Sequence, residues 1–162
     1  MPAAMEATME DPFKRTALGA AVFYKDPMAA LDWLERAFGF QRMMVITDKD
    51  GKLAHSEMRF LDSYLMVGSE WAHYTASPAS IGGKNTQSVH VHMPDGLDAH
   101  CERARAAGAQ IMREPEDQFY GDRVYVARDP EGHVWSFGQS VRKVSREEAE
   151  QASGLTIDGW SA

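Results

Sequence analysis

The sequence repeats itself at a distance of 69 residues, and this repeat limits the folds that the chain can adopt. When positions 22–43 are laid over positions 91–112, eight of the 22 positions are identical, whereas about one or two matches are expected by chance. Two unrelated amphipathic helices would share some Ala and Arg, but these matches extend beyond the helix at both ends. We therefore predict two copies of one unit. The identical pairs are Val22/Val91, Asp26/Asp95, Ala30/Ala99, Arg36/Arg105, Ala37/Ala106, Gly39/Gly108, Gln41/Gln110 and Met43/Met112.

Each copy begins with an expected strand and continues with an expected helix. Residues 20–24 are apolar, and residues 89–93 alternate between valine or methionine and histidine, which is typical of a strand with one apolar face. Helical spacing of apolar residues follows in both copies. The expected N-caps are Asp26, followed by Pro27 at the first helical position, and Asp95, and the glycines expected to end the helices are Gly39 and Gly108.

Three further strands are expected after each helix, so both copies have the order strand, helix, strand, strand, strand. We predict an α+β fold of tandem βαβββ modules that form cupped mixed sheets. The expected strands are 42–47, 53–60 and 64–67 in the first copy and 110–113, 123–127 and 133–137 in the second. The expected organisation is an N-terminal lead (1–17), a first module (18–68), a connecting segment (69–87), a second module (88–140) and a C-terminal helix and tail (141–162), together one structural domain. Ser145 and Glu148 form a capping box for that last helix.

Composition excludes several classes of function. The formal net charge is −7 with scattered Lys and Arg, which argues against nucleic-acid binding. No apolar run approaches the roughly 18 residues that cross a bilayer, so no membrane partner is expected. Residues 1–13 carry acidic residues and lack the basic and apolar regions of a secretory signal. The single Cys101 cannot form an internal disulfide, and a reducing cytoplasm is the expected compartment.

The candidate ligand-binding residues are aromatic, histidine and arginine side chains. His90 and His92 share one strand face, opposite Val89, Val91 and Met93. Such a pair can bind a metal ion, but a solvated or hydrogen-bonded pair is commoner. Bulk indicates that Trp135 and Phe137 belong to the core. The full candidate set is His90, His92, Tyr120, Arg123, Tyr125, Trp71 and Tyr74, of which the segment 118–125 also suits simple packing of a loop into a strand.

The tandem units, together with Asp-Pro-Glu-Gly-His-Val-Trp at 129–135, resemble the vicinal oxygen chelate superfamily. That superfamily includes glyoxalase I, bleomycin-resistance proteins, extradiol dioxygenases and fosfomycin-resistance enzymes. The segment Tyr120-Gly121-Asp122-Arg123 is similar to the branch called PhnB-like. The resemblance covers about residues 18–140. It implies the glyoxalase/bleomycin-resistance fold, a homodimer, and a ligand held in the concavity, formed either within one chain or between two.

The resemblance also implies where a divalent metal would bind. Metal-dependent members place His, Gln or Glu on the first and last strands of each module. By strand phase, these positions are Gly19 or Ala21, Met66, Ser88 with His90 one step along, and Ser136. Glycine, alanine and methionine offer no hard ligand for such an ion, and serine is a poor one. The resemblance therefore implies a departure from the metal site of the family.

Three functional hypotheses follow. The first is a binder of a small organic molecule of the bleomycin-resistance type, with no metal or other cofactor. The second is a divalent-metal-dependent lyase or isomerase of the glyoxalase I type, whose shifted ligand set would be His55, Glu57, His90 and His92. The third is a domain retained for assembly or regulation without a specific ligand. The sequence leaves open whether the protein is an enzyme, because this fold carries many chemistries.

Overall fold

The computed structural model describes residues 8–160 of the 162-residue chain. Residues 1–7 of the expected lead and residues 161–162 of the expected tail lie outside the described part. The first module contains β1 (Ala20–Tyr24), α1 (Pro27–Phe38), β2 (Gln41–Thr47), β3 (Leu53–Phe60) and β4 (Ser63–Ser69). A 3₁₀ turn, η1 (Pro78–Ser80), follows in the connecting segment. The second module contains β5 (Val89–Met93), α2 (Leu97–Ala106), β6 (Gln110–Asp117), β7 (Asp122–Arg128) and β8 (Val134–Ser140), and α3 (Arg146–Ser153) ends the chain.

The predicted order of elements is confirmed in both modules, with differences at the element ends. Strand β6 runs four residues beyond the predicted end at Arg113 and contains Pro115. Proline cannot donate to a ladder, which is why the sequence favours an earlier end. Here β6 is the outer strand of its sheet, and its pairing with β7 shifts register between Arg113 and Glu116. An edge position with a bulge tolerates the missing donor.

The two helix N-termini differ although an aspartate stands at the matching position of each. Asp26 caps α1, since its carboxylate accepts a hydrogen bond from Ala29 N at 3.0 Å. The prediction that Asp95 caps α2 is wrong, because the N-cap is Gly96, with a φ of 76° and no side-chain cap. The left-handed backbone at Gly96 turns the chain one residue later than in the first module. The side chain of Gln139 supplies the missing acceptor to Leu97 N at 3.0 Å.

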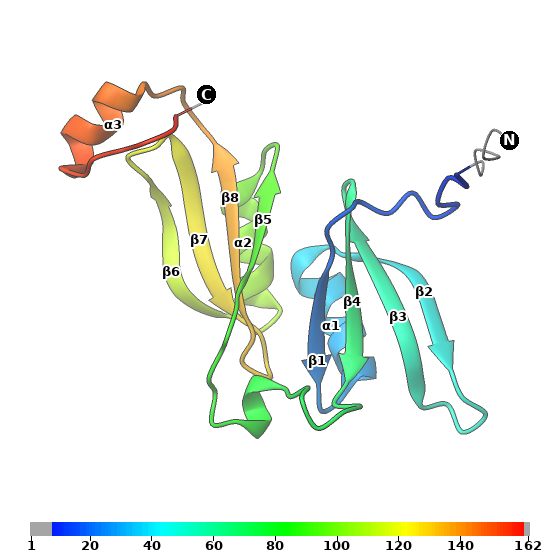
Figure 1. Cartoon of the computed structure of the whole chain (residues 1–162). Helices are drawn as coiled ribbons and strands as arrows, with labels where there is room; N and C mark the ends of the chain where they lie inside the picture. The colour runs from blue at the N-terminus through cyan, green and yellow to red at the C-terminus, as the bar shows by residue number, and fades with distance from the viewer. Residues whose placement is uncertain (1–7, 161–162) are drawn as a thin grey trace, which may run out of the picture.

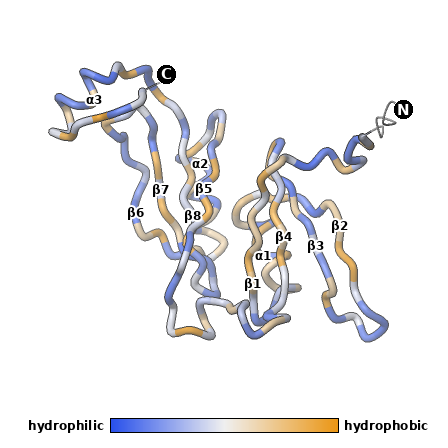
Figure 2. Tube along the Cα trace, viewed as in Figure 1, coloured by the Kyte–Doolittle hydropathy of each residue, from blue (hydrophilic) through white to orange (hydrophobic). Residues whose placement is uncertain are grey.

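The two modules form separate four-stranded sheets that stand side by side (Figure 1). The strand orders are β1-β4-β3-β2 and β5-β8-β7-β6, in which β1 pairs with β4 and β5 with β8 in parallel and the other pairs are antiparallel. Strands β1 and β5 are the inner edges, whereas β2 and β6 lie farthest apart. Strands β1 and β4 of the first sheet are largely apolar, and the hairpin that joins β2 and β3 is polar (Figure 2).

One hydrophobic core runs through both modules, because the two helices pack on each other and on one face of each sheet. The Phe38 ring of α1 contacts Phe137 of β8, with ring centroids 4.8 Å apart. Trp135 and Phe137 are fully buried, so the prediction that they belong to the core is confirmed. Trp33 of α1 donates its indole N–H to the carbonyl of Ala107 at 2.8 Å. These contacts fix one module against the other.

A second connection between the modules is made by the turn that joins β7 and β8. The buried Asp129 carboxylate accepts the Tyr24 hydroxyl of β1 at 2.7 Å and the Trp135 indole N–H at 3.1 Å. It also accepts the backbone N–H groups of Glu131 and His133 at 3.1 and 3.0 Å. The Asp129 carboxylate therefore satisfies two side-chain donors and two backbone donors at once.

The same turn reaches the start of α1. The Glu131 carboxylate accepts the backbone N–H groups of Lys25 and Asp26 at 2.7 and 3.1 Å, and the Ser77 hydroxyl at 2.9 Å. A carboxylate beside a helix N-terminus is also favoured by the helix dipole. The turn of the second module thus holds the first module and the connecting segment together.

We expect Asp129→Ala to lower the free energy of unfolding by about 3 kcal/mol, because it leaves a buried hydroxyl, an indole N–H and two backbone N–H groups without their acceptor. Urea denaturation measures the change. The exposed turn residue Asp50 is the matched control, and Asp50→Ala should change stability by less than about 0.5 kcal/mol. A loss no larger than that of the control would show that Asp129 does not join the modules.

Candidate functional site

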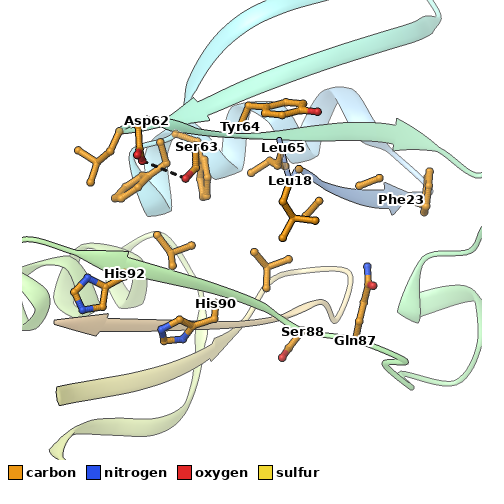
Figure 3. Close-up of a pocket in the computed structure, with 18 residues that line it drawn as sticks. Leu18, Phe23, Asp62, Ser63, Tyr64, Leu65, Gln87, Ser88, His90 and His92 are labelled. Carbon is orange, nitrogen blue, oxygen red and sulfur yellow. Dashed lines mark hydrogen bonds between the residues drawn. The ribbon is translucent and has the colours of Figure 1, made fainter. Parts of the chain in front are cut away.

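A cleft of about 950 Å³ lies between the inner edges of the two sheets (Figure 3). Its volume is in the range of small-molecule sites, and most of its lining side chains are apolar. Strands β1 and β4 form one wall, and β5 together with the segment that leads into it forms the other. The lining residues are Leu18, Gly19, Ala20, Ala21, Phe23, Phe40, Phe60, Leu61, Asp62, Ser63, Tyr64, Leu65, Gln87, Ser88, Val89, His90, Val91 and His92.

Small residues on β1 and its approach shape the wall of the first module. A Cβ atom on Gly19 would lie 2.5 Å from the Tyr64 ring, so a larger residue here would push the end of this side chain aside. Leu18 is 86% exposed and Leu61 is 58% exposed at the cleft. Leu61 has a φ of 52°, a left-handed conformation that is rare for a leucine. The β3–β4 turn thus presents an apolar side chain to the cleft at a conformational cost.

His90 and His92 lie on the open face of the second sheet, as the strand periodicity predicts. His90 Nδ1 lies 2.7 Å from the Ser136 hydroxyl, its register partner on β8. His92 Nε2 lies 3.1 Å from the Ser140 hydroxyl, which donates to Asp122 at 2.8 Å. Because Ser140 uses its proton on Asp122, His92 donates its Nε2–H to Ser140. Both imidazoles are thus oriented by serines while remaining exposed to solvent.

Gly138 makes room for the His90 ring. A Cβ atom at Gly138 would lie 3.1 Å from His90 Cε1 and 3.3 Å from His90 Nε2. The ring therefore extends across β8 toward Gly138, the residue that faces His92 in the register. The sequence contains this glycine inside a strand, a signal of close approach that the prediction of the site did not use.

Two other predicted site residues face away from the histidines. Tyr125 pairs with Phe137, which pairs with Val91, so all three point toward the helices. Tyr125 is fully buried, its hydroxyl lies 2.6 Å from His100 Nδ1, and burial raises the pKa of its hydroxyl. Arg123 lies two residues before Tyr125 on β7 and therefore shares its face of the strand, and its guanidinium forms ion pairs with Asp98 and Asp117. The structure does not bring Tyr125 or Arg123 to the cleft.

The remaining predicted residues lie at two further places. Trp71 and Tyr74, in the connecting segment, are 65% and 68% exposed and contact each other edge to face, with ring centroids 5.5 Å apart. Tyr74 borders a smaller hollow of about 270 Å³ beside His133. Tyr120 lies in the β6–β7 turn and packs on Phe119. None of the three lines the cleft beside His90 and His92.

The open face of the first sheet holds an ion pair that the sequence analysis missed. Glu57 is only 4% exposed, and its two carboxylate oxygens accept hydrogen bonds from Arg15 Nε and Nη2 at 2.8 and 3.0 Å. His55 Nε2 lies 3.1 Å from the same carboxylate. The hydrogen bond from Arg15 lowers the pKa of Glu57 below its usual value. Arg15 lies in the lead, where sequence spacing gave no signal of a contact with β3.

The metal positions implied by the resemblance can be tested against the strand register. Ala21 pairs with Met66, and His90 pairs with Ser136. Of these four positions only His90 carries a good ligand for a divalent ion. The residues present therefore do not fit the metal site of the family.

The shifted ligand set fits no better. His55 and Glu57 belong to β3 of the first sheet, whereas His90 and His92 belong to β5 of the second. Within residues 8–160, no three His, Cys, Asp or Glu side chains lie close enough together to hold a metal ion.

Comparison with known proteins identifies the family. Residues 16–137 match the model of the Glyoxalase/Bleomycin resistance protein/Dioxygenase superfamily. The chain belongs to this superfamily. Its two βαβββ modules have the fold of the family, as the resemblance in the sequence implied. No observation tests the finer assignment to the PhnB-like branch, which stays a prediction.

Relatives of this superfamily member cover most of its length. An uncharacterized protein of Mycobacterium bovis, Mb0911c, is 33% identical over 147 residues, 88% of this chain and 95% of that protein. The crystal structure of TioX from Micromonospora sp. ML1 is similar with a TM-score of 0.64 and 34% identity, covering 78% of this chain and 99% of TioX. The fosfomycin resistance protein FosX from Listeria monocytogenes, 13% identical, shares the fold with a TM-score of 0.56, covering 83% and 97%. In this superfamily member, none of the helices within residues 8–160 is long and apolar enough to span a membrane.

We expect Gly138→Ala to displace the His90 ring by a few tenths of an ångström and lengthen its hydrogen bond to Ser136, because the new Cβ would lie 3.1 Å from His90 Cε1. Since His90 is exposed and can turn into solvent, the free energy of unfolding should change by less than about 1 kcal/mol. The ¹⁵N chemical shifts of the imidazoles report the change. Ser140→Ala is the control, which should alter His92 and leave His90 unchanged. Unaltered His90 shifts in Gly138→Ala would contradict the assigned packing.

Proposed function

We propose that this member of the superfamily binds a small organic molecule in the cleft between the two sheets, without a metal ion. The observation that carries the proposal is the cleft itself, which has the volume and apolar lining of a small-molecule site. His90 and His92 supply oriented imidazoles at one end of it. Binding needs affinity and no chemistry, so the absence of metal-binding side chains at the family's metal positions does not weaken the proposal.

Metal-assisted lyase or isomerase chemistry is less well supported. Such chemistry needs a divalent ion held by several side chains that polarises the substrate. Ala21, Met66 and Ser136 are poor ligands or none at the positions where the family holds that ion. The geometry therefore favours the binder over the enzyme. The single Cys101, free and buried, suits a reducing compartment, so we propose that the protein acts in the cytoplasm.

A ligand of the cleft should raise the melting temperature by several degrees at a hundredfold excess over its Kd, because binding to the native state alone stabilises it by about 2.7 kcal/mol. A thermal-shift screen of aromatic antibiotics, bleomycin included, and of divalent metals measures this. Ala21→Phe, which fills the cleft, should abolish the shift. The matched control is Ala54→Phe, on an exposed position outside the cleft, which should keep it.

Elemental analysis of the same purified protein should find far less than one nickel, zinc or iron ion per chain. About one ion per chain would overturn the metal-free proposal, and loss of that ion in the double variant His90→Ala/His92→Ala would support the enzyme instead. Absence of any stabilising compound in the screen would favour a domain without a specific ligand.

We also propose that the protein is a homodimer. Within residues 8–160, β1 and β5 each have a neighbouring strand on one side only, and an edge strand of this kind can pair with another chain. Leu18 and Leu61 expose apolar surface beside these edges. A second copy would cover both features.

We expect Leu18→Glu to weaken the dimer at least tenfold, because it places a charge in the apolar contact. Sedimentation equilibrium measures the change. Leu155→Glu is the control, since Leu155 is also exposed but lies in the C-terminal segment, away from the cleft. A monomer in the unmodified protein at all concentrations would refute the proposal.

A further inference from the structure

Glu57 is an acidic side chain in an apolar part of the open face of the first sheet. Its register partners are Met66 on β4 and Met44 on β2, and Met66 in turn pairs with Ala21 in the cleft wall. Only 4% of Glu57 is exposed. Burying a carboxylate among apolar neighbours is costly unless a cation pairs with it. A carboxylate at this position therefore requires a positively charged partner.

Arg15 is that partner, and it has the geometry of a bound ligand. Its Nε and Nη2 bind one carboxylate oxygen each, at 2.8 and 3.0 Å, the bidentate arrangement in which guanidinium binds carboxylate most strongly. The guanidinium also lies over the Phe13 ring, 4.4 Å from its centroid. Planar cations with two parallel N–H donors match this site, whereas an ammonium group provides a single point of contact.

The segment that supplies Arg15 is held by few contacts. Residues 8–17, here called the strap, contain no helix or strand. Besides the Arg15–Glu57 pair, Arg59 of β3 donates to the Phe13 carbonyl at 2.9 Å. Phe13 is nearly half exposed, so its burial adds little to the free energy that holds the strap on the sheet. Lys14 has a φ of 52°, a conformation that costs energy in a residue other than glycine. The strap is thus attached through polar contacts that a ligand can replace.

The strap also leads directly into the cleft. Leu18, three residues after Arg15, lines the cleft, and Arg59 is the register partner of the cleft residue Tyr64. The cleft residue Ala21 pairs with Met66, and Met66 pairs with Glu57, so one sheet face connects the cleft to this carboxylate. The net charge of −7 attracts cations to the protein as a whole.

We propose that Arg15 occupies a cation subsite of the ligand-binding face, and that the ligand is an organic molecule bearing a guanidinium or amidinium group that displaces the strap and pairs with Glu57. This inference rests on the proposed small-molecule function and names its ligand class. Because Arg15 competes for the site, the apparent affinity for such a ligand is reduced by the fraction of molecules in which the strap is closed.

The test is isothermal titration of the full-length protein with benzamidine, a planar amidinium on an aromatic ring. Arg15→Ala should bind benzamidine at least tenfold more tightly than the unmodified protein, because the competing guanidinium is gone. Adding Glu57→Gln to that variant should weaken binding at least tenfold. Arg146→Ala, which removes an exposed arginine paired with Glu147 elsewhere on the protein, is the matched control and should bind like the unmodified protein.

Two further measurements separate a specific site from general attraction of cations and from misfolding. Benzamide, the neutral analogue, should not bind Arg15→Ala. Arg15→Lys keeps the charge beside Glu57 but loses the bidentate contact, so a folded protein with intermediate benzamidine affinity is expected. In the unmodified protein, saturating benzamidine should speed hydrogen–deuterium exchange in residues 8–17.

Equal affinity of the unmodified protein and both Arg15 variants would overturn the inference, as would binding that survives Glu57→Gln or a strap whose exchange is unchanged at saturation. The proposed function is judged separately with Ala21→Phe. A cleft ligand lost in that variant, together with no benzamidine binding in Arg15→Ala, would leave the binder standing and refute the cation subsite. Benzamidine binding that depends on Glu57, without any cleft ligand in the screen, would support the cation subsite and contradict the proposal that the cleft between the sheets binds a small molecule.

Discussion

The buried Asp129 carboxylate is the constraint on which the placement of the two modules depends. It joins Tyr24 of the first module to Trp135 and to the backbone of its own turn in the second. Glu131, two residues later, binds the first backbone N–H groups at the start of α1. The helix packing adds a directional contact of its own, the hydrogen bond from the Trp33 indole to the Ala107 carbonyl. Together, these contacts hold the end of β1 and the start of α1 against the β7–β8 turn of the second module.

The features that the sequence predicts well are those set by local chemistry. The Asp26 cap, the Gly39 end of α1 and the Ser145 cap of α3 all appear in the structure, since each is decided within a few residues of the chain. Asp95 shows the limit of the same reasoning. Its position matches Asp26, but Gly96 allows a backbone conformation that moves the cap by one residue. A single glycine changed the outcome of an otherwise sound analogy.

The candidate site was harder to predict because it depends on how strands that are distant in the sequence pair with each other. Alternation correctly placed His90 and His92 on the open face, since the pattern within β5 is sufficient for that. Whether Tyr125 shares that face depends on its register with Phe137, which no local pattern records. Trp71 and Tyr74 lie in the connecting segment, away from the cleft, and no local pattern records the path of that segment. Arg15 reaches Glu57 across 42 residues, and only the folded chain brings these charges together.

The two open faces differ in how their polar groups are satisfied, and this difference bears on what the cleft can bind. In the second sheet, His90 and His92 are paired with neutral hydroxyls and stay in contact with water, so they can exchange partners at little cost. In the first sheet, Glu57 is removed from water, and its carboxylate is bound by Arg15 from outside the sheet and lies beside His55 of its own strand. In the proposed binding mode, a ligand that replaces Arg15 would bring a positive charge of its own, because a buried carboxylate is costly without a cationic partner. Under that proposal, the first module would restrict the charge of the ligand, and the second would adapt to its shape.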